Sequence, residues 1–312
     1  MNTTEEKAEL AERFLQEKRH LEAIRLYEEL VRFNPNDDSY RLALAWAYND
    51  SGRTEDAISL FEELFEKELA RKIFTGFAFD ELVKIFKQEK TYDRMVGICE
   101  KAFAAQPEDT GLLFTLGDAY MMNGMPVKAI EVFKKIILME PDASSCFMSL
   151  GNAQVASGDF TGAEEAYAQA SSIDPFCTDV YQNRLGMTYL RAGEYARAKT
   201  AFQKAVDYKS DEPVYHCNLG DVLVLEGRLD EAETAYETAS ALKPEARSVY
   251  LNRLGNTLYQ EKRYLKAIVL FKKAVAMEPE NPFYHIHLAR SYEAAGFPAE
   301  AQKEIEKAES LK

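Results

Sequence analysis

The chain has 312 residues, 46% of them hydrophobic and 12% aromatic, so it can bury an extensive core and is not disordered. Its 52 acidic and 38 basic residues give a formal net charge of -14, which disfavours nonspecific binding to nucleic acid. No apolar stretch approaches the roughly 20 residues needed to cross a bilayer, and the first seven residues lack the basic start and apolar core of a secretion signal. We therefore expect a cytoplasmic protein with no membrane span and no nucleic-acid ligand.

Nine similar units follow one another along the chain, and a Leu-Gly pair marks five of them. The glycine of this pair advances by steps of 34 or 35 residues. A fixed period in this range is typical of stacked helix pairs, in which each pair buries its apolar face only against its neighbours. The units begin near Thr4, Asp38, Gly76, Thr110, Ser144, Asp179, Pro213, Ser248 and Pro282, and the last one ends at Lys312.

Each unit has the pattern of two helices joined by a turn. The first helix is predicted to end at a glycine, because a left-handed conformation costs glycine least. In the second helix a small residue is followed four positions later by a large one, so both lie on the same helix face. The turn glycines are Gly52, Gly124, Gly158, Gly193, Gly227 and Gly296, and the small and large pairs are Ala23 and Tyr27, Ala57 and Phe61, Ala129 and Phe133, Ala163 and Tyr167, Ala198 and Phe202, Ala232 and Tyr236, and Ala267 and Phe271.

This combined pattern resembles the tetratricopeptide repeat family, whose 34-residue motif carries Leu-Gly, an aromatic residue, a later alanine, a second aromatic residue and a final proline. The resemblance covers essentially the whole chain. It implies an all-α fold, a single right-handed superhelical solenoid of tandem antiparallel helix pairs over residues 1–312. It also implies a protein that does no chemistry and holds an extended or helical segment of a partner protein in its concave groove.

The third unit departs most from the pattern. Met95 stands in its alanine position and Cys99 in its aromatic position. About four extra residues precede it, around Leu69 to Phe74. We expect any bend or irregularity of the solenoid near 69–75, between the second and third repeats.

A longer period of two units is also visible. The block at 180–186, Val-Tyr-Gln-Asn-Arg-Leu-Gly, reappears two units later at 249–255 as Val-Tyr-Leu-Asn-Arg-Leu-Gly. A duplication of two repeats would explain both copies, and so would a packing demand that is common to them. Packing alone does not require the Asn-Arg pair on a solvated stretch.

Residues able to do chemistry are sparse. The early core position of the first helix holds His216 and His285, where packing with one satisfied nitrogen is the simplest role. His285 and His287 are two residues apart and face different sides of a helix, which argues against a shared metal. The periodicity brings together no Ser/His/Asp or Cys/His constellation, and there is no glycine-rich phosphate loop. The sequence thus predicts no enzyme activity, no catalytic residue, no metal site and no cofactor.

If the first helices line the groove, the residue before each Leu-Gly position faces it, and one column there is polar and partly basic. Guanidinium groups on an otherwise acidic chain favour recognition of a carboxylate through paired hydrogen bonds. Amide side chains beside them can satisfy the donors and acceptors of a peptide backbone. The alternative is a merely solvated surface. The expected peptide-binding residues are Asn183, Arg184, Asn218, Asp221, Asn252, Arg253, Asn256, His287 and Arg290.

Two classes of function fit these patterns. The first is a non-catalytic scaffold or adaptor whose protein or peptide partner carries an acidic or C-terminal carboxylate group. The second is a regulatory or accessory subunit that senses a small ligand or peptide signal and controls an enzyme. A closed, ligand-sized pocket would favour the second class.

Overall fold

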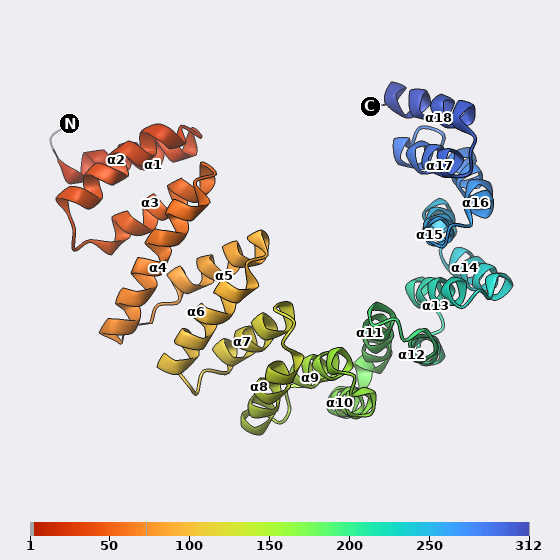
Figure 1. Cartoon of the computed structure of the whole chain (residues 1–312), viewed down its shortest axis with the longest axis horizontal. Coiled ribbons are helices and arrows are strands. Elements are labelled where there is room, and N and C mark those ends of the chain that lie inside the picture. Colours follow the sequence, from red (N-terminus) through yellow and green to blue (C-terminus); the bar gives the residue numbers. More distant parts are fainter. Residues whose placement is uncertain (1–2, 73, 312) are drawn as a thin grey trace. The chain divides into compact units, whose positions relative to one another are not determined.

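A computed structural model of the protein describes residues 3–72 and 74–311, which form eighteen α-helices and two short 3-10 helices, without a strand. The chain divides into two compact units, Met1–Met139 and Glu140–Lys312, which are described separately. Figure 1 shows each unit as a succession of antiparallel helix pairs. The all-α class and the tandem helix pairs predicted from the sequence are confirmed. The expected end of the last repeat at Lys312 lies outside the described residues, as do Met1, Asn2 and Ile73.

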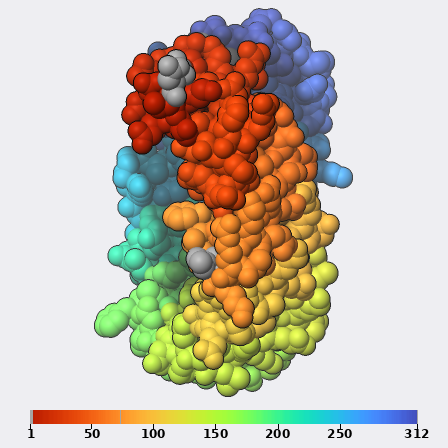
Figure 2. Space-filling view, turned by 90° about the vertical axis from the view of Figure 1, so that its left-hand side faces the viewer, coloured from red at the N-terminus to blue at the C-terminus, as the bar shows by residue number. Residues whose placement is uncertain are grey.

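The first unit holds four helix pairs. Its helices are α1 (Thr4–Gln16), α2 (His20–Phe33), α3 (Asp38–Asp50), α4 (Thr54–Arg71), α5 (Phe77–Glu89), α6 (Tyr92–Ala105), α7 (Thr110–Met122) and α8 (Pro126–Met139). Figure 2 shows the surface of this unit, on which each pair, from red through orange to yellow, lies directly against the next.

The second unit holds five helix pairs. Its helices are α9 (Ser144–Ser157), α10 (Phe160–Ile173), α11 (Thr178–Arg191), α12 (Tyr195–Tyr208), α13 (Pro213–Leu225), α14 (Leu229–Leu242), α15 (Arg247–Gln260), α16 (Tyr264–Met277), α17 (Pro282–Ala294) and α18 (Pro298–Ser310). The first helices of all nine pairs begin within one residue of the unit starts expected from the sequence.

Close approach of the two helices in a pair explains the Leu-Gly motif. A β-carbon built on Gly220 would lie 2.6 Å from the ring of Tyr236, and one on Gly151 would lie 2.6 Å from the ring of Tyr167. Gly186 stands in the same relation to Phe202. The large aromatic residue of each second helix therefore fills the space that the glycine leaves, and both tyrosines are fully or almost fully buried.

The extra residues before the third repeat lengthen a helix. α4 has 18 residues, whereas the other helices of the first unit have 13 or 14, and Lys72 ends α4 in a left-handed conformation. A single solenoid over 1–312 with an irregularity near 69–75 stays a prediction. Ile73, within that range, lies outside the described residues.

The two-repeat period extends well beyond the repeated block. The 3-10 helices η1 (Pro175–Cys177) and η2 (Pro244–Ala246) lie two repeats apart, directly before α11 and α15. Before α13 and α17 the chain instead enters the helix at a proline, Pro213 or Pro282. His216 Nε2 donates to the Ser210 carbonyl at 2.8 Å, and two repeats later His285 Nε2 donates to the Pro279 carbonyl at 2.9 Å. These correspondences favour a duplication of two repeats.

Candidate functional site

A ladder of polar side chains runs across the first helices of the second unit. Asn218 Nδ2 of α13 donates to Asn183 Oδ1 of α11 at 2.6 Å. Arg253 Nη2 of α15 donates to Asn218 Oδ1, also at 2.6 Å. Asn218 is buried and Asn183 is half-buried, and the ladder links α11, α13 and α15. The sequence predicted that these residues share a face, and the structure brings them into contact.

Asp221 is the centre of this network. One of its oxygens, Oδ1, accepts from the Tyr236 hydroxyl and from the Thr257 hydroxyl, both at 2.6 Å. The other oxygen, Oδ2, accepts from Arg253 Nε at 2.9 Å and Nη2 at 2.6 Å. Burial, together with the nearby charge of Asp221, raises the pKa of Tyr236, so this hydroxyl stays protonated and donates. The carboxylate of Asp221 is therefore satisfied within the chain.

The same network recurs two repeats earlier in the chain with one chemical difference. Asn152 Oδ1 accepts from the Tyr167 hydroxyl at 2.6 Å and from the Thr188 hydroxyl at 2.8 Å, as Asp221 does from Tyr236 and Thr257. Arg184, which corresponds to Arg253, lies close enough for its charge to lower the pKa of Tyr167, although burial is the larger effect and raises it. Because Asn152 is neutral, Arg184 is exposed and makes no ion pair with any described residue.

The last repeat of the column is built around His287. Its Nδ1 lies 2.7 Å from Asn252 Oδ1 and 3.5 Å from Asn256 Nδ2. Burial, and to a smaller extent the charge of Arg290, lowers the pKa of His287, so the ring is neutral near pH 7. The Arg290 guanidinium lies 5.5 Å from the ring centre of Tyr259 and is exposed.

The arginines of the column are not all unpaired in the structure. The sequence suggested that the arginines of the column are available to an external carboxylate. Arg253 is instead paired with Asp221, which is 15% exposed in its side chain, and Arg253 itself is 36% exposed. The remaining guanidinium groups of the column, Arg184 and Arg290, are the two exposed ones.

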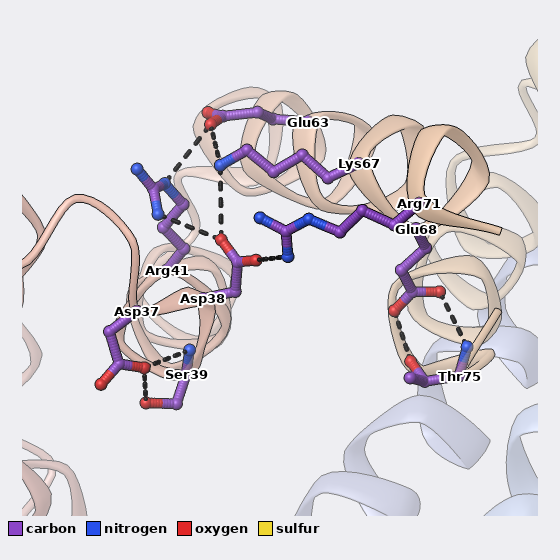
Figure 3. Close-up of polar contacts among 9 residues, drawn as sticks. All are labelled: Asp37, Asp38, Ser39, Arg41, Glu63, Lys67, Glu68, Arg71 and Thr75. Carbon is purple, nitrogen blue, oxygen red and sulfur yellow. Dashed lines mark hydrogen bonds and ion pairs between the residues drawn. The ribbon is translucent and has the colours of Figure 1, made fainter. Parts of the chain in front are cut away.

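A pocket of about 250 Å³, lined by apolar and charged side chains, lies in the first unit, where α3, α4 and α5 meet. Figure 3 shows Asp38 of α3 at its edge, accepting from Arg41, Lys67 and Arg71 at 2.8 to 3.3 Å. Burial raises the pKa of Asp38, but the hydrogen bonds from Arg71 and Lys67 outweigh it and lower the pKa overall. Sequence reasoning missed this cluster, because Arg71 belongs to the extra residues that were expected to form an irregularity.

On the opposite side of the same pocket, Glu68 accepts from the backbone amide of Thr75 at 3.1 Å and from its hydroxyl. This contact holds the chain between α4 and α5 against the end of α4 (Figure 3). Glu63 in turn lies 2.7 Å from Lys67 and 3.3 Å from Arg41. Every charged group of this cluster except Glu68 thus belongs to an ion pair.

Three family models described as tetratricopeptide repeat match the chain. They cover residues 14–70, 144–177, 183–247, 217–282 and 258–310, which together amount to more than half of the chain. The chain belongs to the tetratricopeptide repeat family. A model of the PPR repeat also matches residues 115–139, within α7 and α8.

Curated relatives align with parts of this chain. Protein O-mannosyl-transferase TMTC1 of Homo sapiens is 25% identical over 50% of this chain and 18% of its own length. BBSome complex member BBS4 of Bos taurus is 23% identical over 87% of this chain and 51% of its own length. Small glutamine-rich tetratricopeptide repeat-containing protein 2 of Mycosarcoma maydis is 31% identical over 35% and 30%, respectively. The chain spans about half or less of the length of these relatives.

Solved structures give a likeness of fold only. A crystal structure of MamA is 22% identical with a TM-score of 0.42, covering 55% of this chain and 94% of that one. The crystal structure of yeast Tom70 is 13% identical with a TM-score of 0.42, covering 99% and 92%. In the part of this chain that the structure describes, no helix is long and apolar enough to span a membrane. The same residues include no cluster of three His, Cys, Asp or Glu side chains able to hold a metal ion.

Proposed function

We propose that the chain is a non-catalytic scaffold that binds a peptide segment of a partner protein on the first helices of its second unit, in the concave groove of the solenoid. The partner segment carries an acidic side chain or a C-terminal carboxylate. The observation that carries this proposal is the exposed guanidinium of Arg184, which no carboxylate of the described residues neutralises, beside a ladder of amide side chains. The proposal places the protein in the cytoplasm, where its four free cysteines stay reduced.

The residues of the column divide into two roles. Arg184 and Arg290 are exposed and supply the planar donors that pair with carboxylates. Asn183, Asn252 and Asn256 are half-buried and keep amide groups at the surface for a peptide backbone.

Three of the expected residues instead hold the surface together. Asn218, Asp221 and Arg253 bond mainly to one another and to neighbouring helices. His287 joins the ladder through Asn252. Their removal is therefore expected to disturb the ligand indirectly, by letting the surface relax.

The test is titration of the full chain with a fluorescein-labelled octapeptide rich in Asp and Glu and ending in a free carboxylate. Replacing Arg184 by alanine should weaken binding by about 1.5 to 3 kcal/mol, which is the usual worth of a hydrogen bond to a charged group. Arg184→Lys should restore only part of the affinity, because an ammonium lacks the planar fork. Arg263→Ala removes an exposed arginine at the start of α16 and should leave the affinity unchanged. Equal affinities for all four proteins would exclude this surface.

The pocket at α3, α4 and α5 favours the second candidate function, a regulatory or accessory subunit that senses a small ligand. A small anion bound there would replace Asp38 as the partner of Arg71. The test is the melting temperature of the full chain in millimolar succinate, citrate or phosphate. A dose-dependent rise that Arg71→Ala abolishes would support this function, and a melting temperature that none of the three anions changes would exclude it.

A further inference from the structure

A groove of about 610 Å³ lies among the last helices of the second unit, between α14 and α16, with α15 as its floor. Leu251, Leu254 and Leu258 supply the floor, at the spacing of one helix face. Val269 and Leu270 of α16 continue the apolar surface. Because each of the three helices contributes residues three or four apart over about two turns, the groove runs along the helices for roughly 10 Å.

Between α10 and α12, two repeats earlier, an ion-pair bridge spans the equivalent space, where the pocket is smaller, about 400 Å³. In the second unit, Glu164 of α10 accepts from the Tyr189 hydroxyl at 3.2 Å and from Arg197 of α12 at 2.9 Å. Tyr189 and Arg197 lie on the next repeat, so this contact ties two second helices together across the intervening first helix.

A related bridge occurs in the first unit, with its glutamate one turn later in the second helix. Glu100 of α6 accepts from the Tyr120 hydroxyl at 2.7 Å and lies 3.8 Å from Lys128 of α8. Glu28 of α2 likewise accepts from the Tyr48 hydroxyl at 2.8 Å. A tyrosine, a glutamate and a cation thus span the space between neighbouring repeats.

The α14–α16 groove lacks this bridge. At the equivalent positions two repeats after the bridged site, Glu233 replaces Glu164, Lys266 replaces Arg197 and Leu258 replaces Tyr189. Leu258 has no hydroxyl, and neither Glu233 nor Lys266 makes an ion pair with any described residue. The space between α14 and α16 is therefore unbridged above the leucines of α15, and its volume of about 610 Å³ exceeds the 400 Å³ or so of the bridged space.

The two walls of the groove carry opposite charges. Glu233 and Glu237 line the α14 side, whereas Lys266 and Lys273 line the α16 side. All four side chains are exposed, and none of them has an ion-pair partner among the described residues. Exposed carboxylates and ammonium groups facing each other over an apolar floor complement a ligand that has an apolar stripe and two edges of opposite charge.

We propose that the α14–α16 groove binds an amphipathic α-helix of a partner protein, with basic residues along one edge of its apolar stripe and acidic residues along the other. The apolar stripe lies on the leucines of α15, as in other helix-in-groove complexes. The basic edge faces Glu233 and Glu237, and the acidic edge faces Lys266 and Lys273. This site is separate from the column of Arg184, and the two can fail independently.

The test uses a labelled 18-residue helical peptide with leucines at positions i, i+3, i+4 and i+7, lysines on one edge and glutamates on the other. Two control peptides keep the leucines and carry only lysine or only glutamate on both edges. In the full chain carrying Arg184→Ala, so that the first-helix site does not bind the glutamates, the peptide with mixed edges should bind at least tenfold more tightly than either control. Equal binding of all three would overturn the charge argument and with it the proposal.

Two substitutions locate the site. Val269→Glu places a charge on the apolar surface at a half-exposed position and should weaken binding at least tenfold. Thr200→Glu makes the same change at the equivalent, bridged position of α12 and should have no effect. If both variants bind like the wild type, the site lies elsewhere and the proposal is wrong. Arg184→Ala should leave the affinity for the mixed-edge peptide unchanged. A negative result for the groove would therefore not contradict the proposed binding site at Arg184.

A third variant rebuilds the missing bridge. Leu258→Tyr combined with Lys266→Arg recreates the side chains that bridge and narrow the upstream space, and it should weaken peptide binding at least tenfold while keeping the helical circular dichroism signal. The other possible occupant of the groove is a second copy of this chain. Sedimentation of the wild type over a range of concentrations tests for such a dimer. A dimer that Val269→Glu dissociates would show that a second copy of this chain fills the groove, which would overturn the assignment to a partner protein.

Discussion

Asn152 and Asp221 occupy equivalent positions two repeats apart, and they differ by one chemical group. Both accept hydroxyl hydrogen bonds from a tyrosine and a threonine. The carboxylate of Asp221 also forms an ion pair with Arg253, whereas Asn152 is neutral and Arg184 is exposed. Two nearly identical networks therefore differ in their arginine: in one it is paired with a carboxylate across the repeats, and in the other it is exposed.

The largest expected difference between the two copies is in stability. Asp221→Ala removes the acceptor of two hydroxyl groups and leaves Arg253 without a counter-ion. Because the pair is partly exposed, we expect this variant to lower the free energy of unfolding by about 3 kcal/mol. Asn152→Ala removes two neutral hydrogen bonds and should cost about 1 to 2 kcal/mol. Urea denaturation followed by circular dichroism measures both. Equal losses would mean that the ion pair adds nothing to the shared network.

The next prediction concerns the glycine against which Tyr236 packs. A β-carbon at Gly220 would lie 2.6 Å from the Tyr236 ring, so Gly220→Ala should cost about 1 to 3 kcal/mol through overpacking. The β-carbon of Gly151→Ala would meet Tyr167 at the same distance, but the loss of stability should be smaller. A displaced Tyr167 hydroxyl gives up a bond to the neutral amide of Asn152, whereas Tyr236 gives up a bond to the carboxylate of Asp221. A β-carbon on Gly97 of α6 would have no atom within 4 Å, and Gly97→Ala should be neutral or slightly stabilising. Thermal denaturation of the three variants decides the order.

Much of this fold was predictable from the sequence, because the two helices of each repeat pack in the same way. The Leu-Gly pairs and turn glycines mark close helix approach and left-handed turns, and both are local features. The periodicity also placed Asn183, Asn218 and Arg253 on one face. Membership of the column follows from register alone.

The state of each arginine could not be predicted in the same way. The repeated block at 180–186 and 249–255 contains both Arg184 and Arg253 in the same local sequence. The residue that distinguishes them, Asn152 or Asp221, lies 32 residues earlier, in the preceding repeat. Extending the comparison over the full two-repeat period, beyond the block, would have exposed this difference. The α14–α16 groove likewise lacks its bridge because Leu258 stands where Tyr189 stands two repeats earlier.

Exchanging the two residues should exchange the behaviour of the arginines. Asn152→Asp places a carboxylate beside Arg184 and should weaken binding of the acidic octapeptide about tenfold, or about 1.4 kcal/mol. Asp221→Asn keeps the hydroxyl hydrogen bonds, releases Arg253 and should strengthen binding. The double variant should bind about as well as the wild type, through Arg253 instead of Arg184. Fluorescence anisotropy measures all three affinities, and two single variants that change in the same direction would contradict the exchange.

The smallest expected effect is a pH dependence of stability at His287, which Asn218, its equivalent two repeats earlier in the chain, does not have. Each bonds to an asparagine of the preceding first helix, but only the histidine titrates. The pKa of His287 is lowered in the fold, so the unfolded chain binds the proton more readily, and stability falls as the pH drops below the ordinary histidine value of about 6.5. His287→Asn keeps a partner for Asn252 and should remove this loss. Between pH 7.5 and 5.5, the difference in unfolding free energy between wild type and variant should therefore shift by up to roughly 1 kcal/mol in favour of the variant, with no shift between pH 7.5 and 8.5. Parallel stability profiles down to pH 5.5 would mean that protonation of His287 costs the folded state nothing.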